Sequence, residues 1–260
     1  MSERMILSLI LKAVENIPLI EKGDDIAEII FKNAPDIADK DIIVIASTIV
    51  SKSLGLTFLE SDIIPGAEAE RIAAANGKDP RFVQAILDES IEVFTETPFM
   101  LVRNKNGHVC INAGIDASNV GGDFLLTLPE KPDRYAAAIG KAIEEKSGKK
   151  ISVIITDTNG RAFKEGQTNV AVGLYNIKPI RQWIGEKDLY GKVLEISEEA
   201  VVDEIAGAAN LIMGEGGDGV PAVIVSGLNL YTDEPVSVTE MYREKEKDLI
   251  LRGLLELKEK

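Results

Sequence analysis

The sequence predicts a mixed α/β (α+β) fold, because strand-like and helix-like patterns alternate along its 260 residues. Two continuous β-branched runs, 41–47 and 151–156, are typical of strands buried on both faces of a sheet. Asn106-Gly107 stands between two short apolar runs and predicts the tight turn of an antiparallel hairpin. The chain should therefore contain both buried strands and at least one antiparallel pair.

In the first half, a short apolar run predicts a strand over 5–11, and helical spacing predicts a helix over 24–34 with Asp24 or Asp25 as its cap. The buried strand 41–47 comes next. Two short helices are expected at 67–76 and 80–90, with Gly77 between them as a C-terminal cap. Three short strands follow at 91–96, 99–105 and 108–114.

In the second half, Pro near its start and Gly at its end delimit a helix over 132–148. Strands are expected at 151–156, 169–175 and 220–227, and an amphipathic helix at 198–214. The intervening segment 157–168 lacks periodicity and predicts a long loop. The tail from Thr239 to Lys260 predicts a terminal helix capped by Thr239. Two lobes are expected, divided loosely near residue 128, at about 1–128 and 129–260.

Composition excludes several classes of function. The 43 acidic and 29 basic residues give a net charge of −14, which disfavours nonspecific binding to nucleic acid. A single cysteine, Cys110, excludes an intrachain disulfide, and a single histidine, His108, excludes zinc sites built from several His or Cys ligands. Any metal should have mostly oxygen ligands, which favours Mg²⁺, Mn²⁺ or Ca²⁺.

The run 5–11 is too short to span a bilayer, and with no signal-peptide pattern we expect a cytoplasmic protein without a membrane partner.

Two segments place carboxylates where ligands collect. Asp157-Thr158 follows a buried strand directly, at the mouth of a sheet, and Arg161 and Lys164 come after it as groups that can grip anions. Asp116, with Asn119 three residues on, lies among small residues that allow close approach of a phosphate or metal. Read alone, each segment fits an ordinary turn equally well or better.

A glycine-rich segment at 214–221 and a polar one at 46–55 could contact phosphates. Gly214, Gly216 and Gly219 match G-x-G-x-x-G, but a helix precedes them and a strand follows, which is wrong for a dinucleotide fingerprint. An anion-binding loop remains possible, with Glu215 and Asp218 available to a cation. Lys52 after a strand either holds a phosphate or is simply solvated. We expect a turn or edge position for His108, a core position for Cys110 and a packing role for Trp183.

Taken jointly, six segments resemble the coenzyme F420-0:L-glutamate ligases (gamma-glutamyl ligases) of archaea and actinobacteria. They are IPLIEKGDD at 17–25, STIVSKSLG at 47–55, CINAGIDASNV at 110–120, ITDTNGRAFKEGQTNVAVG at 155–173, WIGEKDLYGKVLEIS at 183–197 and DEIAGAANLIMGEGGDGVPAVIVSG at 203–227. The resemblance runs from about Ile17 to the terminal helix, without the C-terminal reductase domain of many bacterial members. It favours a ligand role for Asp116, Asp157 and the glycine loop.

The resemblance implies a family-specific two-lobed fold, an intertwined homodimer, and GTP-dependent addition of L-glutamate to the lactyl carboxylate of F420-0. It implies two divalent cations, Mn²⁺ or Mg²⁺, with K⁺ assisting. Asp116 and Asp157 match catalytic acidic ligands of the first metal, and Thr158 and Glu215 match positions near the second; Arg161 and Lys164 are possible substrate residues. The implied nucleotide contacts are Pro18, Leu19, Ile20, Glu21, Ser47, Thr48, Lys52, Asn119, Met213, Gly214, Glu215, Gly216, Gly217, Asp218, Gly219 and Val220.

Other interpretations stay open. A related metal-dependent amide ligase for another carboxylate, using ATP or GTP, would carry the same motifs, and no N-K-x-D run identifies guanine. A nucleotide-binding paralogue without turnover is a second alternative, although intact Asp116, Asp157 and Glu215 argue against it. A structural protein without ligand would leave the motifs unexplained. The number of glutamates added cannot be deduced from the motifs.

Overall fold

The computed structural model describes residues 8–258, and its centre is a mixed five-stranded sheet in the order β1-β12-β2-β8-β9. β2 and β8 run parallel, and every other neighbouring pair is antiparallel. Its strands are β1 (Ile10–Ala13), β12 (Ala222–Ser226), β2 (Ile42–Ala46), β8 (Ser152–Arg161) and β9 (Lys164–Tyr175). The mixed α/β prediction is confirmed.

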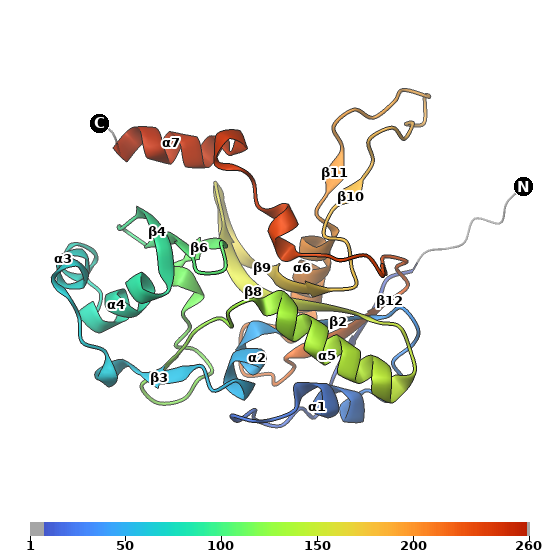
Figure 1. Ribbon diagram of the computed structural model, residues 1–260, viewed down its shortest axis with the longest axis horizontal. Helices are drawn as coiled ribbons and strands as arrows, with labels where there is room; N and C mark the ends of the chain where they lie inside the picture. The colour runs from blue at the N-terminus through green and yellow to red at the C-terminus, as the bar shows by residue number, and fades with distance from the viewer. Residues whose placement is uncertain (1–7, 259–260) are drawn as a thin grey trace, which may run out of the picture.

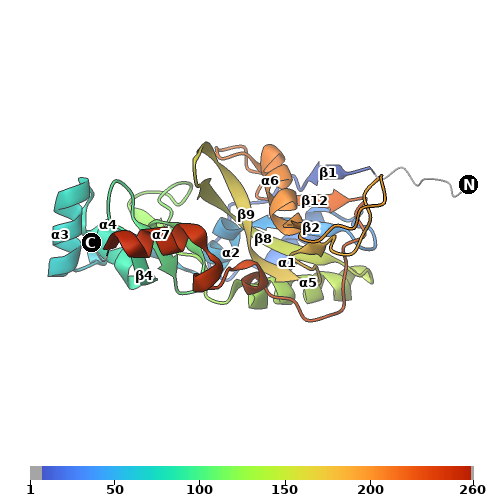
Figure 2. The ribbon, with the colours of Figure 1, turned by 90° about the horizontal axis from the view of Figure 1, so that it is seen from above.

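Helices cover both faces of this sheet (Figure 2). Alternate residues of β2 point to opposite faces, as strand geometry requires, so Ile43 and Ile45 belong to one core and Ile42 and Val44 to the other. The first core includes helices α1 (Ile26–Asn33), α2 (Ser47–Ser53) and α5 (Pro132–Ser147). The second includes α6 (Val201–Met213) and the segment around η3 (Val238–Met241). The result is three layers with the sheet in the middle.

A third core lies beside the central sheet, at the left of Figure 1. It is built by residues 58–125, inserted between α2 and α5. The elements here are β3 (Thr57–Leu59), η1 (Glu60–Asp62), α3 (Ala67–Asn76), α4 (Pro80–Asp88), β4 (Ser90–Thr95), β5 (Leu101–Asn104), β6 (Val109–Ile111), η2 (Asn112–Gly114) and β7 (Phe124–Leu126). β4-β5-β6 form one antiparallel sheet and β3-β7 another.

The central sheet takes strands from both sides of residue 128, so that position does not separate one sheet from another. The boundary between lobes placed there stays a prediction. Two helix caps predicted from the sequence are confirmed. Asp25 caps α1 by accepting a hydrogen bond from the Glu28 amide, and Gly77 ends α3 in the left-handed conformation. The turn at Asn106-Gly107 joins β5 to β6, with a 2.8 Å bond from the Gly107 amide to the Asn104 carbonyl.

Three predicted elements need correction. Segment 157–168 is not a long loop: β8 and β9 continue as a paired hairpin with cross-strand partners from Asp157↔Val170 to Arg161↔Lys164. The N-terminal strand runs over Ile10–Ala13, because its partner β12 ends at Ser226 opposite Ile10; residues 5–7 of the predicted strand lie outside the described residues. In the β8–β9 hairpin, antiparallel pairing satisfies the backbone hydrogen bonds of polar residues, so strands form there without apolar periodicity.

The tail is also different from the expected single helix. It forms η3, capped by Ser237 through a capping box, then η4 (Lys245–Lys247) and α7 (Leu249–Lys258). Asp248 caps α7, accepting bonds from the amides of Ile250 and Leu251, so Thr239 is not the cap. A small two-stranded arm, β10 (Arg181–Gln182) and β11 (Glu198–Glu199), projects at the upper right of Figure 1. Within residues 8–258 no helix is long and apolar enough to cross a membrane.

Candidate functional site

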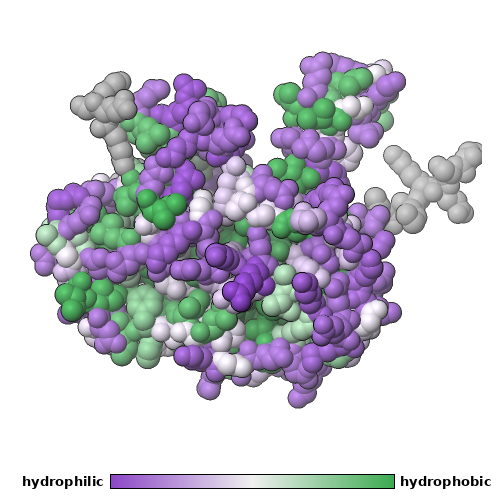
Figure 3. Space-filling view, in the orientation of Figure 1, coloured by the Kyte–Doolittle hydropathy of each residue, from purple (hydrophilic) through white to green (hydrophobic). Residues whose placement is uncertain are grey.

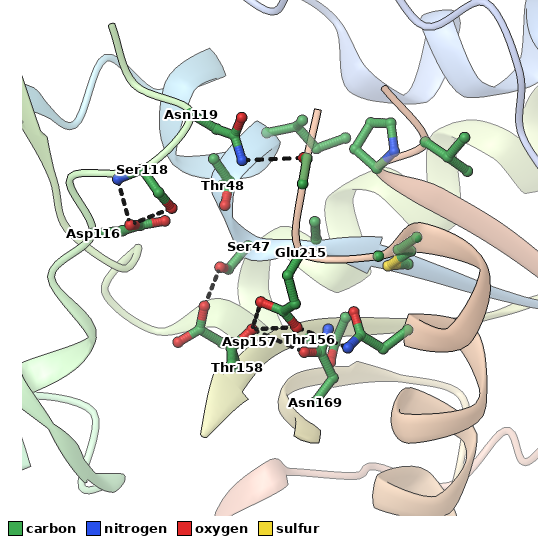
Figure 4. A pocket seen from close by; sticks show the side chains of 18 of the residues that line it. Ser47, Thr48, Asp116, Ser118, Asn119, Thr156, Asp157, Thr158, Asn169 and Glu215 are labelled. Atoms are coloured by element: carbon green, nitrogen blue, oxygen red, sulfur yellow. Dashed lines mark hydrogen bonds between the residues drawn. The ribbon is translucent and has the colours of Figure 1, made fainter. Parts of the chain in front are cut away.

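A cavity of about 490 Å³ lies where the parallel strands β2 and β8 end, a volume within the usual range for small-molecule sites. Ligands of α/β proteins collect at the carboxyl ends of such strands. The wall is completed by residues 17–20, by the loop 114–119 and by the glycine-rich loop after α6 (Figure 4). Segments far apart in the sequence therefore converge on one opening.

Asp157 stands on β8 at the inner end of this cavity. Its Oδ1 accepts a 2.8 Å hydrogen bond from Ser47 Oγ, at the start of α2. Burial raises the pKa of the Asp157 carboxyl to about 6; the Ser47 bond opposes this, while the nearby negative charges of Asp116 and Glu215 add to it. The charged form of Asp157 is therefore disfavoured in the cavity unless a proton or a cation neutralises it.

Asp116 reaches the cavity from the neighbouring loop. Its backbone pairs with Leu126 in both directions, and its Oδ1 accepts bonds from the Ser118 amide (2.6 Å) and the Ser118 hydroxyl (2.7 Å). These bonds occupy one carboxylate oxygen and leave Oδ2 without a bond from any described residue. Ser118 was not predicted, although a Ser two residues after Asp is a familiar turn partner.

The loop that carries Asp116 is shaped by three consecutive left-handed residues. Asn112, Ala113 and Gly114 have φ values of 52°, 59° and 73°. A Cβ on Gly114 would lie 2.5 Å from Leu128 Cδ1 and 3.6 Å from Asp157 Oδ2. Glycine is required here by both conformation and space, and strain of this kind concentrates at functional sites.

Glu215 approaches from the glycine-rich loop and is held by three side chains. Asn210 Nδ2 donates to Oε1 at 2.8 Å, and Gln167 Nε2 donates to Oε2 at 3.2 Å. The Thr158 hydroxyl lies 3.1–3.3 Å from both oxygens and 3.0 Å from Asn169 Oδ1. Each Glu215 oxygen already accepts from one amide, so the single hydroxyl hydrogen of Thr158 is free to bond Asn169 Oδ1, and four oxygen atoms gather at this corner of the cavity.

Lys52 is the cationic side chain among the described residues that line the cavity. It donates to the carbonyl of Asn119, whose own Nδ2 reaches the Gly216 carbonyl across the opening at 3.5 Å. None of Asp116, Asp157 and Glu215 forms a salt bridge with a described residue. The acidic side of the cavity is therefore balanced by neutral donors alone.

Most of the predicted site residues line the cavity together. They are Pro18, Leu19, Ile20, Ser47, Thr48, Lys52, Asp116, Asn119, Asp157, Thr158, Met213, Gly214, Glu215, Gly216, Gly217, Gly219 and Val220. Four predicted residues do not: Glu21, Asp218, Arg161 and Lys164. Arg161 and Lys164 pair at the tip of the β8–β9 hairpin, where the Arg161 guanidinium binds the carbonyls of Glu165 and Gly166.

Sequence reasoning missed Gln167, Asn169 and Asn210, which also line the cavity. Gln167 pairs with Gly160 and Asn169 with Thr158, so strand alternation places them on one face of the hairpin. That signal was present but was hidden by treating 157–168 as a loop. Asn210 was recognisable as a polar residue in the last apolar turn of α6.

The three rare residues lie outside this cavity. His108 stands at the end of the turn between β5 and β6, the position expected, and it is buried. Burial lowers its pKa to about 4, and its Nε2 lies 3.2 Å from Asn159 Nδ2. Cys110 is a core residue as expected, and burial raises its pKa to about 12. Trp183 is 39% exposed at the base of the projecting arm, where the Arg181 guanidinium lies over its ring at 5.4 Å and Nε1 donates to Glu199; a packing role is consistent with these contacts.

Within residues 8–258 no three carboxylate, imidazole or thiol groups gather closely enough to form a metal site by themselves. The donor set does fit a hard cation that brings other ligands with it. Asp116, Asp157, Glu215 and Thr158 offer oxygen, which Mg²⁺ and Mn²⁺ prefer, and Mg²⁺ is commonly held by one or two carboxylates plus phosphate oxygens and water. Asp116, Asp157, Glu215 and Thr158 are therefore the residues of the cavity that could hold such a cation.

The chain belongs to the F420-0:gamma-glutamyl ligase family, whose model matches residues 15–227 and so spans all the cavity-lining segments. A coenzyme F420:L-glutamate ligase of Methanosarcina mazei is 58% identical over 95% of this chain and 97% of its own length. The proteins of the same name from Archaeoglobus fulgidus and Methanothermobacter thermautotrophicus are 49% and 46% identical, over 93% and 85% of this chain and 96% and 90% of their own lengths. The family resemblance deduced from the motifs is confirmed.

Proposed function

We propose that this protein joins L-glutamate to the lactyl carboxylate of coenzyme F420-0 through an amide bond, at the expense of GTP, in the biosynthesis of coenzyme F420. Membership of the family and the names of the relatives support the ligase activity and its substrates. The observation that carries the proposal is the convergence of Asp116, Asp157 and Glu215 on one cavity beside a glycine-rich loop.

The nucleotide would lie between the glycine-rich loop and residues 17–20. Backbone amides in a loop with four glycines can surround phosphate oxygens, and Lys52 can pair with one of them. Ile17, Pro18, Leu19 and Ile20 supply an apolar wall suited to a base. The preference for GTP over ATP rests on family resemblance, because no described side chain identifies the base.

Two divalent cations, Mn²⁺ or Mg²⁺, would be held by Asp116 and Asp157 at the first position and by Thr158 and Glu215 at the second, with K⁺ assisting. They would neutralise charge developing on the transferred phosphoryl group. Asp116 and Asp157 are, on this proposal, the catalytic residues. The bonds from Ser47 and Ser118 fix the orientation of these two carboxylates and leave the opposite oxygens available.

The reaction would proceed in two displacements. A carboxylate oxygen of F420-0 attacks the γ-phosphorus, the bond between that phosphorus and its bridging oxygen breaks, and GDP leaves. The glutamate amine then attacks the acyl carbon, inorganic phosphate leaves with the carbon–oxygen electron pair, and the proton lost by the nitrogen passes to the departing phosphate. Arg161 and Lys164 at the hairpin tip, about 13 Å along the strand from Asp157 at 3.3 Å per residue, would attract the distant part of the anionic acceptor.

We further propose a homodimer. The arm between β10 and β11 exposes apolar side chains that a monomer would leave in water, among them Leu189 (98%), Tyr190 (96%) and Ile196 (88%). In Figure 3 the outer part of this arm shows hydrophobic residues gathered among hydrophilic ones. Exposed patches of this kind mark association surfaces. The intertwined arrangement and the cytoplasmic location stay predictions.

The proposed reaction is tested with purified protein, GTP, Mn²⁺, K⁺, L-glutamate and F420-0, followed by mass spectrometry. We expect a product heavier by one or more glutamyl units, formed with GDP and dependent on both acceptor and glutamate. Replacing GTP by ATP tests the nucleotide. Nucleotide binding without product, from any carboxylate tried, would instead favour a non-catalytic paralogue; product from another acceptor would identify a related amide ligase.

A further inference from the structure

Glu215 is the most heavily supported side chain in the cavity, and its two amide partners have no task in the proposed reaction. Asn210 on α6 holds Oε1 and Gln167 on β9 holds Oε2. Figure 4 places Glu215 between the hairpin and the glycine-rich loop, pointing toward Thr158. The support therefore comes from two different elements, α6 and β9, and acts on a loop rich in glycine, a residue that restricts the backbone least.

The position of Asn210 is set by the way α6 packs on β9. Asp203, Gly207 and Asn210 are spaced four and three residues apart, so they share one face of the helix. Asp203 Oδ1 accepts a 2.9 Å bond from the Ala171 amide of β9, which fixes the first turn. A Cβ on Gly207 would lie 3.1 Å from Thr168 Oγ1, so glycine allows the close approach that brings Asn210 to the cavity.

We infer that Asn210 and Gln167 are positioning residues that aim Glu215 at the second divalent cation and anchor the glycine-rich loop. This inference rests on the proposed function for the presence of that cation. Each carboxylate oxygen has two lone-pair directions; one amide bond to each oxygen fixes the plane of the carboxylate, and both oxygens also lie 3.1–3.3 Å from Thr158 Oγ1, the other ligand proposed for that cation. Second-sphere partners of this type typically change metal affinity 10–100-fold.

The test measures cation binding to the full chain without turnover. Mn²⁺ is titrated into protein saturated with GDP, and free Mn²⁺ is followed by electron paramagnetic resonance. We expect Asn210→Ala and Gln167→Ala each to weaken the second Mn²⁺ site about 10-fold. Asn210→Asp, which keeps the shape but replaces the amide donor with a carboxylate facing Glu215, should weaken it further. Gly207→Ala should act in the same direction by displacing the helix.

Asn33→Ala is the matched control, because Asn33, like Asn210, lies in the last turn of a helix and donates its Nδ2, here to the Ile29 carbonyl at 2.8 Å, but does not line the cavity. It should leave both Mn²⁺ sites unchanged even if stability falls. Second-site affinity within twofold of wild type in folded Asn210→Ala and Gln167→Ala would overturn the inference. If those variants do not fold, unchanged affinity in Asn210→Asp decides against it. Wild-type protein that binds two Mn²⁺ ions but makes no glutamyl product would reject the proposed reaction alone.

Discussion

Replacing Asp157 with Asn should stabilise the metal-free protein while abolishing turnover. Burial raises the pKa of this carboxyl from 3.8 to about 6, so the folded state binds the proton more tightly than the unfolded chain does. A raised carboxyl pKa means that ionisation opposes folding: the penalty is absent below about pH 4, grows through pH 4–6, and is complete above the folded pKa. Asparagine has no such penalty.

The size of the effect follows from the shift. At about 1.4 kcal/mol per unit, a shift of roughly two units corresponds to an upper limit of about 3 kcal/mol at pH 8. The limit is reduced because Asn accepts a weaker bond from Ser47 Oγ than a carboxylate does. We therefore expect Asp157→Asn to raise the free energy of unfolding by about 1–2 kcal/mol at pH 8, and by roughly half as much at pH 5.

Urea denaturation of both proteins at pH 5 and pH 8, in the presence of a chelator, measures this difference. Asp123→Asn is the control, because Asp123 is exposed and its replacement should change stability by less than about 0.5 kcal/mol at either pH. Added Mn²⁺ with GDP should stabilise wild type more than Asp157→Asn. A variant less stable than wild type at pH 8 without metal would refute the reasoning, and near-normal turnover would reject Asp157 as a ligand.

Three further outcomes are expected. Gly114→Ala should lower the free energy of unfolding by about 1–3 kcal/mol in chemical denaturation, because of its positive φ and the approach to Leu128; an unchanged midpoint would contradict the close packing. Burial depresses the pKa of His108 to about 4. Its contribution to stability is therefore present above the unfolded pKa of about 6.5 and is lost as the pH falls through 4. His108→Gln should flatten the acid limb of a curve of stability against pH, and an identical limb in the variant would refute this explanation. Leu189→Asp should shift sedimentation from dimer to monomer, whereas Lys187→Asp on the same arm is the control for charge alone; a Leu189→Asp dimer would exclude this part of the arm from the interface.

Sequence patterns predicted β2 and the first half of β8 well because these strands are buried on both faces. Residues 42–46 and 152–156 are buried almost without interruption, so the β-branched runs were sufficient evidence. Caps such as Asp25 and Gly77 were predictable for a different reason, since each acts through its own backbone neighbours. The hairpin beyond Asp157 was missed because its stability comes from cross-strand hydrogen bonds, which any polar residue can make.

The assembly of the cavity depended on contacts that local patterns do not contain. Motif resemblance grouped Asp116, Asp157 and Glu215, but it did not show that Ser47, Ser118 and Asn210 donate hydrogen bonds to them. These partners lie 110, 2 and 5 residues away in sequence. Long-range pairs such as Ser47–Asp157 exist only because β2 and β8 are adjacent and parallel.

The distribution of charge explains why a chain with a net charge of −14 can be proposed to bind a polyanion. Each of the three acidic side chains is oriented by a neutral donor, and among residues 8–258 the lining offers one cationic group, Lys52. A nucleoside triphosphate entering alone would be repelled by the carboxylates of the cavity. Divalent cations that enter with it would neutralise both the triphosphate and those carboxylates. Nucleotide affinity should therefore depend strongly on the divalent cation, and the neutral donors keep the carboxylates correctly aimed until that cation arrives.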